Sequence, residues 1–186
     1  VGSGSREREF IDKVKGLSYK EVAARGGGIL KSAALLGKTS EVELLRQTLV
    51  RAKEIINHGT TAVEIKSGYG LNPDDEIKML RVARRIGLET PLTVKTTFLG
   101  AHAVPERFAG RREEYVNEII NEMIPVIASE ELADFIDVFT EDGFFTVEET
   151  DRILNAGMKY GLRAKVHANQ MSFSGGVQIG VKYNAI

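Results

Sequence analysis

Hydrophobic and polar positions divide this chain into two kinds of segment. Four short apolar runs predict buried strands, and between them lie longer segments with apolar residues at helical spacing. The predicted strands cover residues 61–65, 92–99, 135–139 and 163–166. Strands that alternate with helices require parallel pairing with crossover helices, so the pattern predicts an α/β fold. A doubly wound sheet and a barrel both satisfy it, although no GxGxxG follows a strand, which disfavours a dinucleotide-binding sheet.

Helix-start signatures precede most of the helical segments. Three resemble a capping box: Ser18 with Glu21, Ser40 with Glu43, and Thr146 with Glu149. The corresponding helices are expected to end before Gly26, near His58–Gly59, and before Gly161. Asn72–Pro73 places an N-cap before a proline and predicts a helix that closes at Gly87. A further helix over about residues 113–129 contains Pro125, which should kink it or end its regular part.

Polar side chains able to take part in chemistry follow the predicted strands. They are Lys66, His102, Glu141 and His167. In a parallel sheet or barrel the carboxyl ends of all strands open on one edge. We therefore expect these four side chains to converge on a shared cleft, as the residues of an active site do.

The histidines differ in their positions. A lone strand-end histidine is more often a hydrogen-bonded structural residue than a metal ligand, but His167 and His102 both lie at strand ends, which favours a site. Gly100 and Ala101 beside His102 would let a ligand approach closely. His58 falls in the last turn of a helix, where the dipole favours an imidazole, so we interpret it as structural.

Several other segments allow two readings each. The turn at residues 66–70 could direct backbone N–H groups and the Tyr69 hydroxyl toward a ligand, or could be a tight strand-to-helix connection. Residues 26–28, three glycines, could be a hinge or a place where a ligand meets bare backbone. By composition, Arg6 belongs to a solvated charge run. Four acidic residues bracket one strand and could supply a carboxylate, although at least two should only cap or hydrate its ends: Asp134, Asp137, Glu141 and Asp142.

Composition narrows the functional classes. A net charge of −1 gives no electrostatic case for nucleic acid or an anionic membrane surface as a partner. Without cysteine, a metal would be bound by histidines and carboxylates. No stretch approaches the roughly 20 apolar residues of a membrane span. These features predict a soluble, cytoplasmic protein that acts on a small molecule.

Taken together, four segments resemble the imidazolonepropionase family of the amidohydrolase superfamily. They are residues 64–71 (EIKSGYGL), 97–105 (TFLGAHAVP), the segment from Ser18–Tyr19 to residues 26–29 (GGGI), and residues 165–168 (KVHA) followed by Gly175–Gly176. The resemblance covers essentially the whole chain. It implies a metal-dependent TIM-type barrel that hydrolyses 4-imidazolone-5-propanoate to N-formimidoyl-L-glutamate.

The resemblance also assigns residues. It makes His167 a ligand of one divalent metal, zinc or iron, and places His102 and Tyr69 against the imidazolone ring. Arg6 matches the arginine that pairs with the substrate, where a guanidinium can grip a carboxylate by two hydrogen bonds. Tyr19 matches a second substrate-binding residue.

Gln170 departs from the family pattern. It stands three residues after His167, where many relatives have a catalytic glutamate, and a glutamine can orient a water or donate to a carbonyl but cannot act as a base. Two alternatives therefore stay open. One is another cyclic amidohydrolase or deaminase of the superfamily, and the other is a homologue that binds a small carboxylated ligand without turnover.

The resemblance further implies that residues 1–186 are the central part of one barrel domain, an internal fragment that lacks flanking strands and a small β domain. The family's His-x-His metal pair would precede Val1, and a later histidine and aspartate would follow Ile186. Because a catalytic zinc usually has three protein ligands, the chain alone is expected to be inactive, to bind metal weakly and to be poorly stable. A homodimer is one possible state of the full-length protein.

Overall fold

A computed structural model describes residue 2, residues 7–16 and residues 29–186. Its strands are β1 (Ala62–Lys66), β2 (Thr93–Ala101), β3 (Phe135–Thr140) and β4 (Arg163–Ala168). The helices are α1 (Glu7–Val14), α3 (Ile29–Gly37), α4 (Glu41–Asn57), α5 (Pro73–Glu89), η1 (Glu106–Phe108), α6 (Arg112–Glu118), η2 (Ile119–Met123), α7 (Ile124–Ser129), α8 (Val147–Lys159) and α9 (Gly176–Lys182). The predicted alternation of strands and helices is confirmed from β1 onward.

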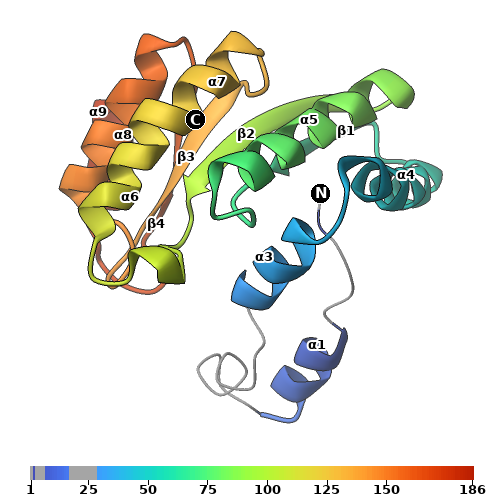
Figure 1. Ribbon diagram of the computed structural model, residues 1–186, viewed down its shortest axis with the longest axis horizontal. Helices are drawn as coiled ribbons and strands as arrows, with labels where there is room; N and C mark the ends of the chain where they lie inside the picture. Colours follow the sequence, from blue (N-terminus) through green and yellow to red (C-terminus); the bar gives the residue numbers. More distant parts are fainter. Residues whose placement is uncertain (1, 3–6, 17–28) are drawn as a thin grey trace.

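The four strands form one parallel sheet in the order β1-β2-β3-β4. Each strand pairs with the next one along the chain, and α5, α8 and α9 pack against β2, β3 and β4 on the same side of the sheet (Figure 1). A doubly wound sheet reverses its strand order at a switch point, whereas a barrel adds its strands in sequence. The chain is thus an α/β protein whose sheet matches part of a (β/α)8 barrel.

Alternation along the strands separates two faces. Residues that point toward the helices are apolar and buried, including Phe98, Ile136, Val138 and Ala164. Side chains at the intervening positions are largely polar: Glu64 and Lys66 on β1, Thr97 on β2, Asp137 on β3, and Lys165 and His167 on β4. One face of the sheet therefore builds the core and the other presents charge.

Most helix ends follow their sequence signatures. The Thr146 hydroxyl accepts a hydrogen bond from the Glu149 N–H at 3.1 Å, and the Glu149 carboxylate accepts one from the Thr146 N–H at 2.8 Å, so the capping box is complete. Ser40 caps α4 through the Glu43 N–H, and α4 ends at His58 as expected. The Asn72 side chain caps α5 through the Asp75 N–H. These starts are local in origin, which is why the sequence reveals them.

One predicted helix end was wrong, and the predicted irregularity near Pro125 is present. Helix α5 continues past Gly87 to Glu89, and a Cβ at Gly87 would come within 3.2 Å of Val94, so this glycine serves close packing on β2 rather than termination. The segment over residues 113–129 is interrupted before Pro125, by the π-helical turn η2. Proline lacks an N–H for the regular helical bond, and the wider turn precedes it.

Strand ends differ slightly from expectation. Lys66 and His167 lie inside β1 and β4 rather than after them, while His102 and Glu141 directly follow β2 and β3. Because the parallel register continues to His167, paired with Phe139, this histidine is held by the sheet itself. No helix among residues 7–16 and 29–186 is long and apolar enough to cross a membrane.

Candidate active site

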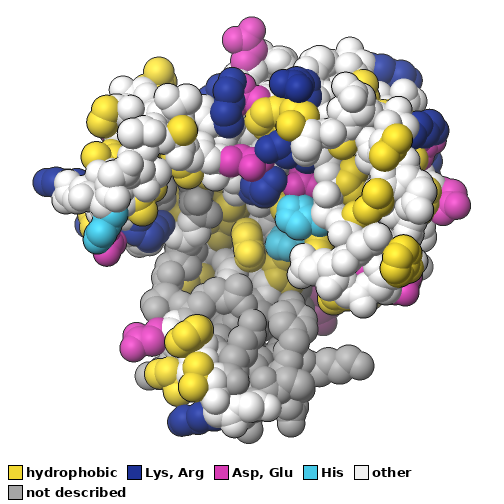
Figure 2. Space-filling view, turned by 180° about the vertical axis from the view of Figure 1, so that it is seen from behind, with side chains coloured by type: hydrophobic (Ala, Val, Ile, Leu, Met, Phe, Trp, Pro, Cys, Tyr) yellow, Lys and Arg dark blue, Asp and Glu magenta, His cyan; other side chains and the backbone are white. Residues whose placement is uncertain are grey.

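The polar face of the sheet gathers ionisable groups toward the carboxyl ends of the strands. Figure 2 shows histidine, basic and acidic side chains together at a hollow on one side of the molecule. Asp137 is at their centre: it is 2% exposed and hydrogen-bonds to β1 and β4, the strands on the two sides of the sheet. The convergence predicted from strand ends is confirmed for Lys66 and His167, which share this carboxylate.

His167 is oriented by that contact. Its Nδ1 lies 3.1 Å from Oδ1 and 3.0 Å from Oδ2 of Asp137. A carboxylate can only accept, so Nδ1 carries a proton in this contact and Nε2 is the nitrogen that is left for another partner. Within the described residues, Nε2 forms no hydrogen bond. An imidazole held by a carboxylate through one nitrogen is the usual arrangement of a metal-binding histidine.

Lysines balance the carboxylates of this face. Lys66 donates to Asp137 Oδ2 at 2.9 Å and to Glu64 Oε1 at 2.8 Å, and Lys165 also reaches Glu64 at 2.8 Å. Burial disfavours the Glu64 carboxylate, but hydrogen bonds from Lys165, Lys66 and the Thr97 hydroxyl outweigh it and lower the pKa of Glu64 to about 2. Burial also disfavours the charged form of Lys66, yet its two acidic partners raise its pKa.

His102 lies in an aromatic group at the same edge. Its ring meets Tyr69 edge-on at 5.2 Å between centroids and Phe139 at 5.8 Å, and Phe139 is also 5.8 Å from His167. Nδ1 of His102 lies 2.9 Å from the Gly68 carbonyl oxygen, which can only accept, so Nδ1 is the protonated nitrogen. Burial lowers the pKa of His102 more than this bond raises it. The ring is thus neutral, with Nε2 as an acceptor.

The turn at residues 66–70 is built around a residue that the sequence reading missed. Glu76 of α5 is fully buried and accepts hydrogen bonds from the N–H groups of Gly68, Gly70 and Leu71 at 2.7, 2.6 and 3.1 Å. Of the two interpretations of this turn, the structure supports the tight strand-to-helix connection for Gly68 and Gly70, whose N–H groups bind Glu76. A carboxylate four residues into the α5 segment, after a glycine-rich turn, was the available signal.

Glu141, which follows β3, supports the loop after β4 in the same way. Its buried carboxylate accepts hydrogen bonds from the Gln170 N–H and from the N–H and hydroxyl of Ser172, the latter two at 3.1 Å. Burial alone would raise its pKa, but these donors lower it. Glu141 thus shapes the loop that carries Gln170, whose own side chain is exposed.

Other predicted site features have structural explanations. Asp134 binds the Thr96 N–H at 2.9 Å and Lys95 at 2.8 Å, so it secures the start of β3. His58 caps α4 and its Nδ1 lies 2.8 Å from the Glu54 carbonyl oxygen, which confirms a structural role. A Cβ on Gly100 would collide with the Phe98 ring at 2.4 Å, so the small residue serves packing rather than ligand access. Arg6, Tyr19, Ser18, Glu21 and the glycines 26–28 lie outside the described residues.

Metal binding cannot be completed by this part of the chain. Among residues 7–16 and 29–186, no group of three histidines, aspartates or glutamates could hold an ion. His167 has the geometry of one ligand, and Asp137 has that of its partner. The residues present therefore fit a portion of a metal site.

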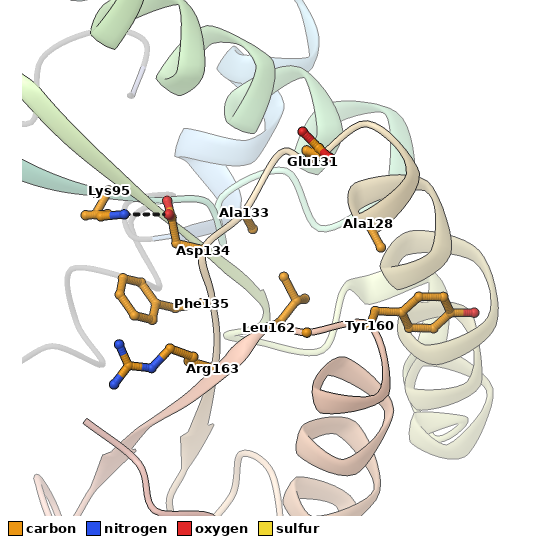
Figure 3. A pocket seen from close by; sticks show the side chains of 10 residues that line it. Lys95, Ala128, Glu131, Ala133, Asp134, Phe135, Tyr160, Leu162 and Arg163 are labelled. Atoms are coloured by element: carbon orange, nitrogen blue, oxygen red, sulfur yellow. Dashed lines mark hydrogen bonds and ion pairs between the residues drawn. The ribbon is translucent and has the colours of Figure 1, made fainter.

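A separate pocket lies at the opposite end of the strands. Lys95, Asp134 and Arg163 line it, together with Tyr160 and Leu162 between α8 and β4, and the Lys95–Asp134 ion pair lies at its side (Figure 3). Sites of α/β sheets and barrels form at the carboxyl ends of strands, whereas the amino ends serve stability. This pocket is consequently not the candidate site.

A parallel sheet in sequential order, with a carboxylate-held histidine at its carboxyl edge, is the arrangement of a (β/α)8-barrel segment that carries a site at that edge. No family model matches the chain. All 186 residues are 53% identical to an imidazolonepropionase of Flavobacterium psychrophilum, 50% to one of Flavobacterium johnsoniae and 43% to one of Paraburkholderia phymatum. The chain spans 45–46% of the length of these curated relatives. By sequence, the chain is similar over its whole length to a segment of imidazolonepropionases.

Proposed function

We propose that the protein containing this chain hydrolyses the ring amide of 4-imidazolone-5-propanoate to give N-formimidoyl-L-glutamate, a step of histidine degradation. One observation carries the proposal: a chain that is 53% identical to an imidazolonepropionase brings His167, His102 and Tyr69 to one edge of a parallel sheet. His167 would contribute one ligand to a zinc or iron ion completed by residues outside this chain. Such an ion supplies a water whose pKa falls to about 7.

The aromatic group suits a planar, polar ring. Neutral His102 offers Nε2 as an acceptor for a ring N–H of the substrate. Its ring packs edge-on against Tyr69, whose hydroxyl is a second polar group of this aromatic cluster. Because the Gly68 carbonyl fixes the His102 tautomer, the acceptor is set before substrate binds. Arg6 would pair with the propanoate carboxylate and Tyr19 would support it, as the family resemblance implies.

Gln170 would orient the attacking water or donate to the ring carbonyl. Its backbone is fixed by Glu141, so its place in the loop after β4 is defined. An amide does not take up a proton at neutral pH, so the proton must be accepted by another group. The presence of glutamine at position 170 also favours a second candidate function, that of a homologue that binds a small carboxylated ligand without turnover.

The test is turnover by the complete protein, loaded with zinc or iron and compared with Gln170→Glu. Loss of imidazolonepropanoate absorbance should accompany formation of N-formimidoyl-L-glutamate. Turnover by the natural protein supports the proposal and places the base elsewhere. Turnover only by Gln170→Glu supports the binding homologue, and turnover by neither protein rejects this substrate.

A matched pair of tyrosine variants tests the ring contact. Tyr69→Phe should raise KM for imidazolonepropanoate, because it removes a hydroxyl from the tyrosine whose ring packs against His102. Tyr160→Phe is the control, since Tyr160 is half-exposed beside the pocket at the other end of the strands. Equal KM values for the two variants would place the substrate away from Tyr69.

A further inference from the structure

Asp137 is the most enclosed ionisable group on the polar face of the sheet. It is 2% exposed, in the middle of β3, and its carboxylate has two charged or polar partners from other strands. Lys66 Nζ lies 2.9 Å from Oδ2, and His167 Nδ1 lies 3.0–3.1 Å from the two oxygens. Burying a carboxylate is costly unless such partners exist, so this position requires an explanation.

We propose that Asp137 is a positioning residue for metal binding, acting through His167. By accepting a hydrogen bond from the Nδ1–H group, Asp137 fixes both the tautomer and the rotation of the imidazole, which leaves Nε2 as the donor atom for a divalent metal. The inference rests on the proposed function, because it assumes that His167 binds the metal there.

The need to neutralise the charge of Lys66 does not explain why a carboxylate is buried at position 137. Lys66 already has an acidic partner in Glu64 at 2.8 Å. Two lysines, Lys66 and Lys165, stand opposite two carboxylates, Asp137 and Glu64, so the charges of this network balance without any contribution from His167.

Lys66 in turn restrains Asp137. It donates to Oδ2 from β1, while the histidine approaches from β4, so the carboxylate is held between the two outer strands of the sheet. Removing Lys66 would leave a buried carboxylate with one partner fewer. We expect Lys66→Met to weaken metal binding less than Asp137→Ala does, because the direct contact to His167 stays.

The experiment measures zinc affinity of the complete protein by competition with a chelator, for Asp137→Ala and the isosteric Asp137→Asn. Loss of a carboxylate that orients a metal-bound histidine typically costs about 10–100-fold in affinity, and we expect that range for Asp137→Ala. Asp134→Ala is the matched control. Asp134 also forms an ion pair and a backbone hydrogen bond, but at the far end of the same strand.

A tenfold or larger loss in Asp137→Ala, with wild-type affinity in Asp134→Ala, would support the proposal. Unchanged affinity in Asp137→Ala, or an equal loss in both variants, would overturn it. If Asp137→Ala does not fold, the proposal is tested by the zinc affinity of Asp137→Asn and by a second measurement on the natural protein.

That measurement is the imidazole tautomer in the zinc-loaded protein, read from long-range ¹H–¹⁵N spectra and assigned with His167→Gln. Protonated Nδ1 in His167 is expected, and protonated Nε2 would overturn the proposal. Neither zinc affinity nor tautomer depends on the substrate. A protein that shows both expected results but does not hydrolyse imidazolonepropanoate would keep this inference and reject the proposed function.

Discussion

Replacing Glu76 by glutamine should loosen the turn that carries Tyr69. Both carboxylate oxygens of Glu76 are occupied: Oε1 accepts from the N–H groups of Gly70 and Leu71, and Oε2 accepts from that of Gly68. A glutamine has one acceptor oxygen. If it stays at the Oε1 position, the side-chain NH₂ faces the Gly68 N–H, and two donors oppose each other.

The magnitude follows from that count. One hydrogen bond is lost and one buried N–H is left unsatisfied, which costs about 1–3 kcal/mol. Burial raises the pKa of Glu76, so removing the charge returns part of that cost. Glu76→Ala leaves three donors without the carboxylate and should cost more than Glu76→Gln does.

Urea unfolding of the complete protein measures the effect. Asp74→Asn is the matched control, because Asp74 lies in the same first turn of α5 but is exposed. It loses its interaction with the helix dipole, about 0.3–1 kcal/mol, and a charge interaction with Arg81. Since the Gly68 carbonyl holds His102, Glu76→Gln should also raise KM for the substrate more than it lowers kcat. A loss of stability no larger than that of the control would refute the reasoning.

Three further outcomes are expected in unfolding experiments on the complete protein. Gly157→Ala should lower the free energy of unfolding by about 1–3 kcal/mol, because a Cβ there would lie 2.7 Å from Ile136 Cδ1. Adding Ile136→Val, which removes that Cδ1 atom, should restore part of the lost stability, and no restoration would contradict the packing argument. Thr146→Ala should cost about 1 kcal/mol through loss of the bond from the Glu149 N–H, and an unchanged midpoint would contradict this. The lowered pKa of Glu64 stabilises the fold above pH 4.5, and this contribution disappears as the pH falls toward about 2. Glu64→Gln should therefore flatten the acid-induced loss in that window by under about 1 kcal/mol, since the side chain is 31% exposed; an unchanged pH profile would count against it.

The sequence predicted helix starts better than helix ends. Thr146 and Ser40 cap their helices through bonds three residues away, which the local order of residues suffices to specify. Gly87 was taken as a stop because glycine commonly ends helices, but its close approach to Val94 depends on how α5 packs on β2. That distance is a property of the packed sheet.

In the candidate site, too, some residues could be predicted from the sequence and others only from the structure. Strand-end positions and family motifs singled out His167, His102 and Tyr69, and the structure brings these rings into one aromatic group around Phe139. Asp137 was only one of four acidic residues near a strand. Its contact with His167, thirty positions along the chain, exists because the parallel register sets β3 beside β4.

By itself, the sequence determined the alternation of strands and helices, the caps and the edge where chemistry gathers, because these depend on periodicity and on neighbours a few residues apart. The tertiary structure decided the partners: Asp137 between Lys66 and His167, and Glu76 beneath the turn at Gly68. Buried carboxylates are tolerated only where donors from separate segments meet them. That meeting depends on strand register and helix packing across the whole sheet.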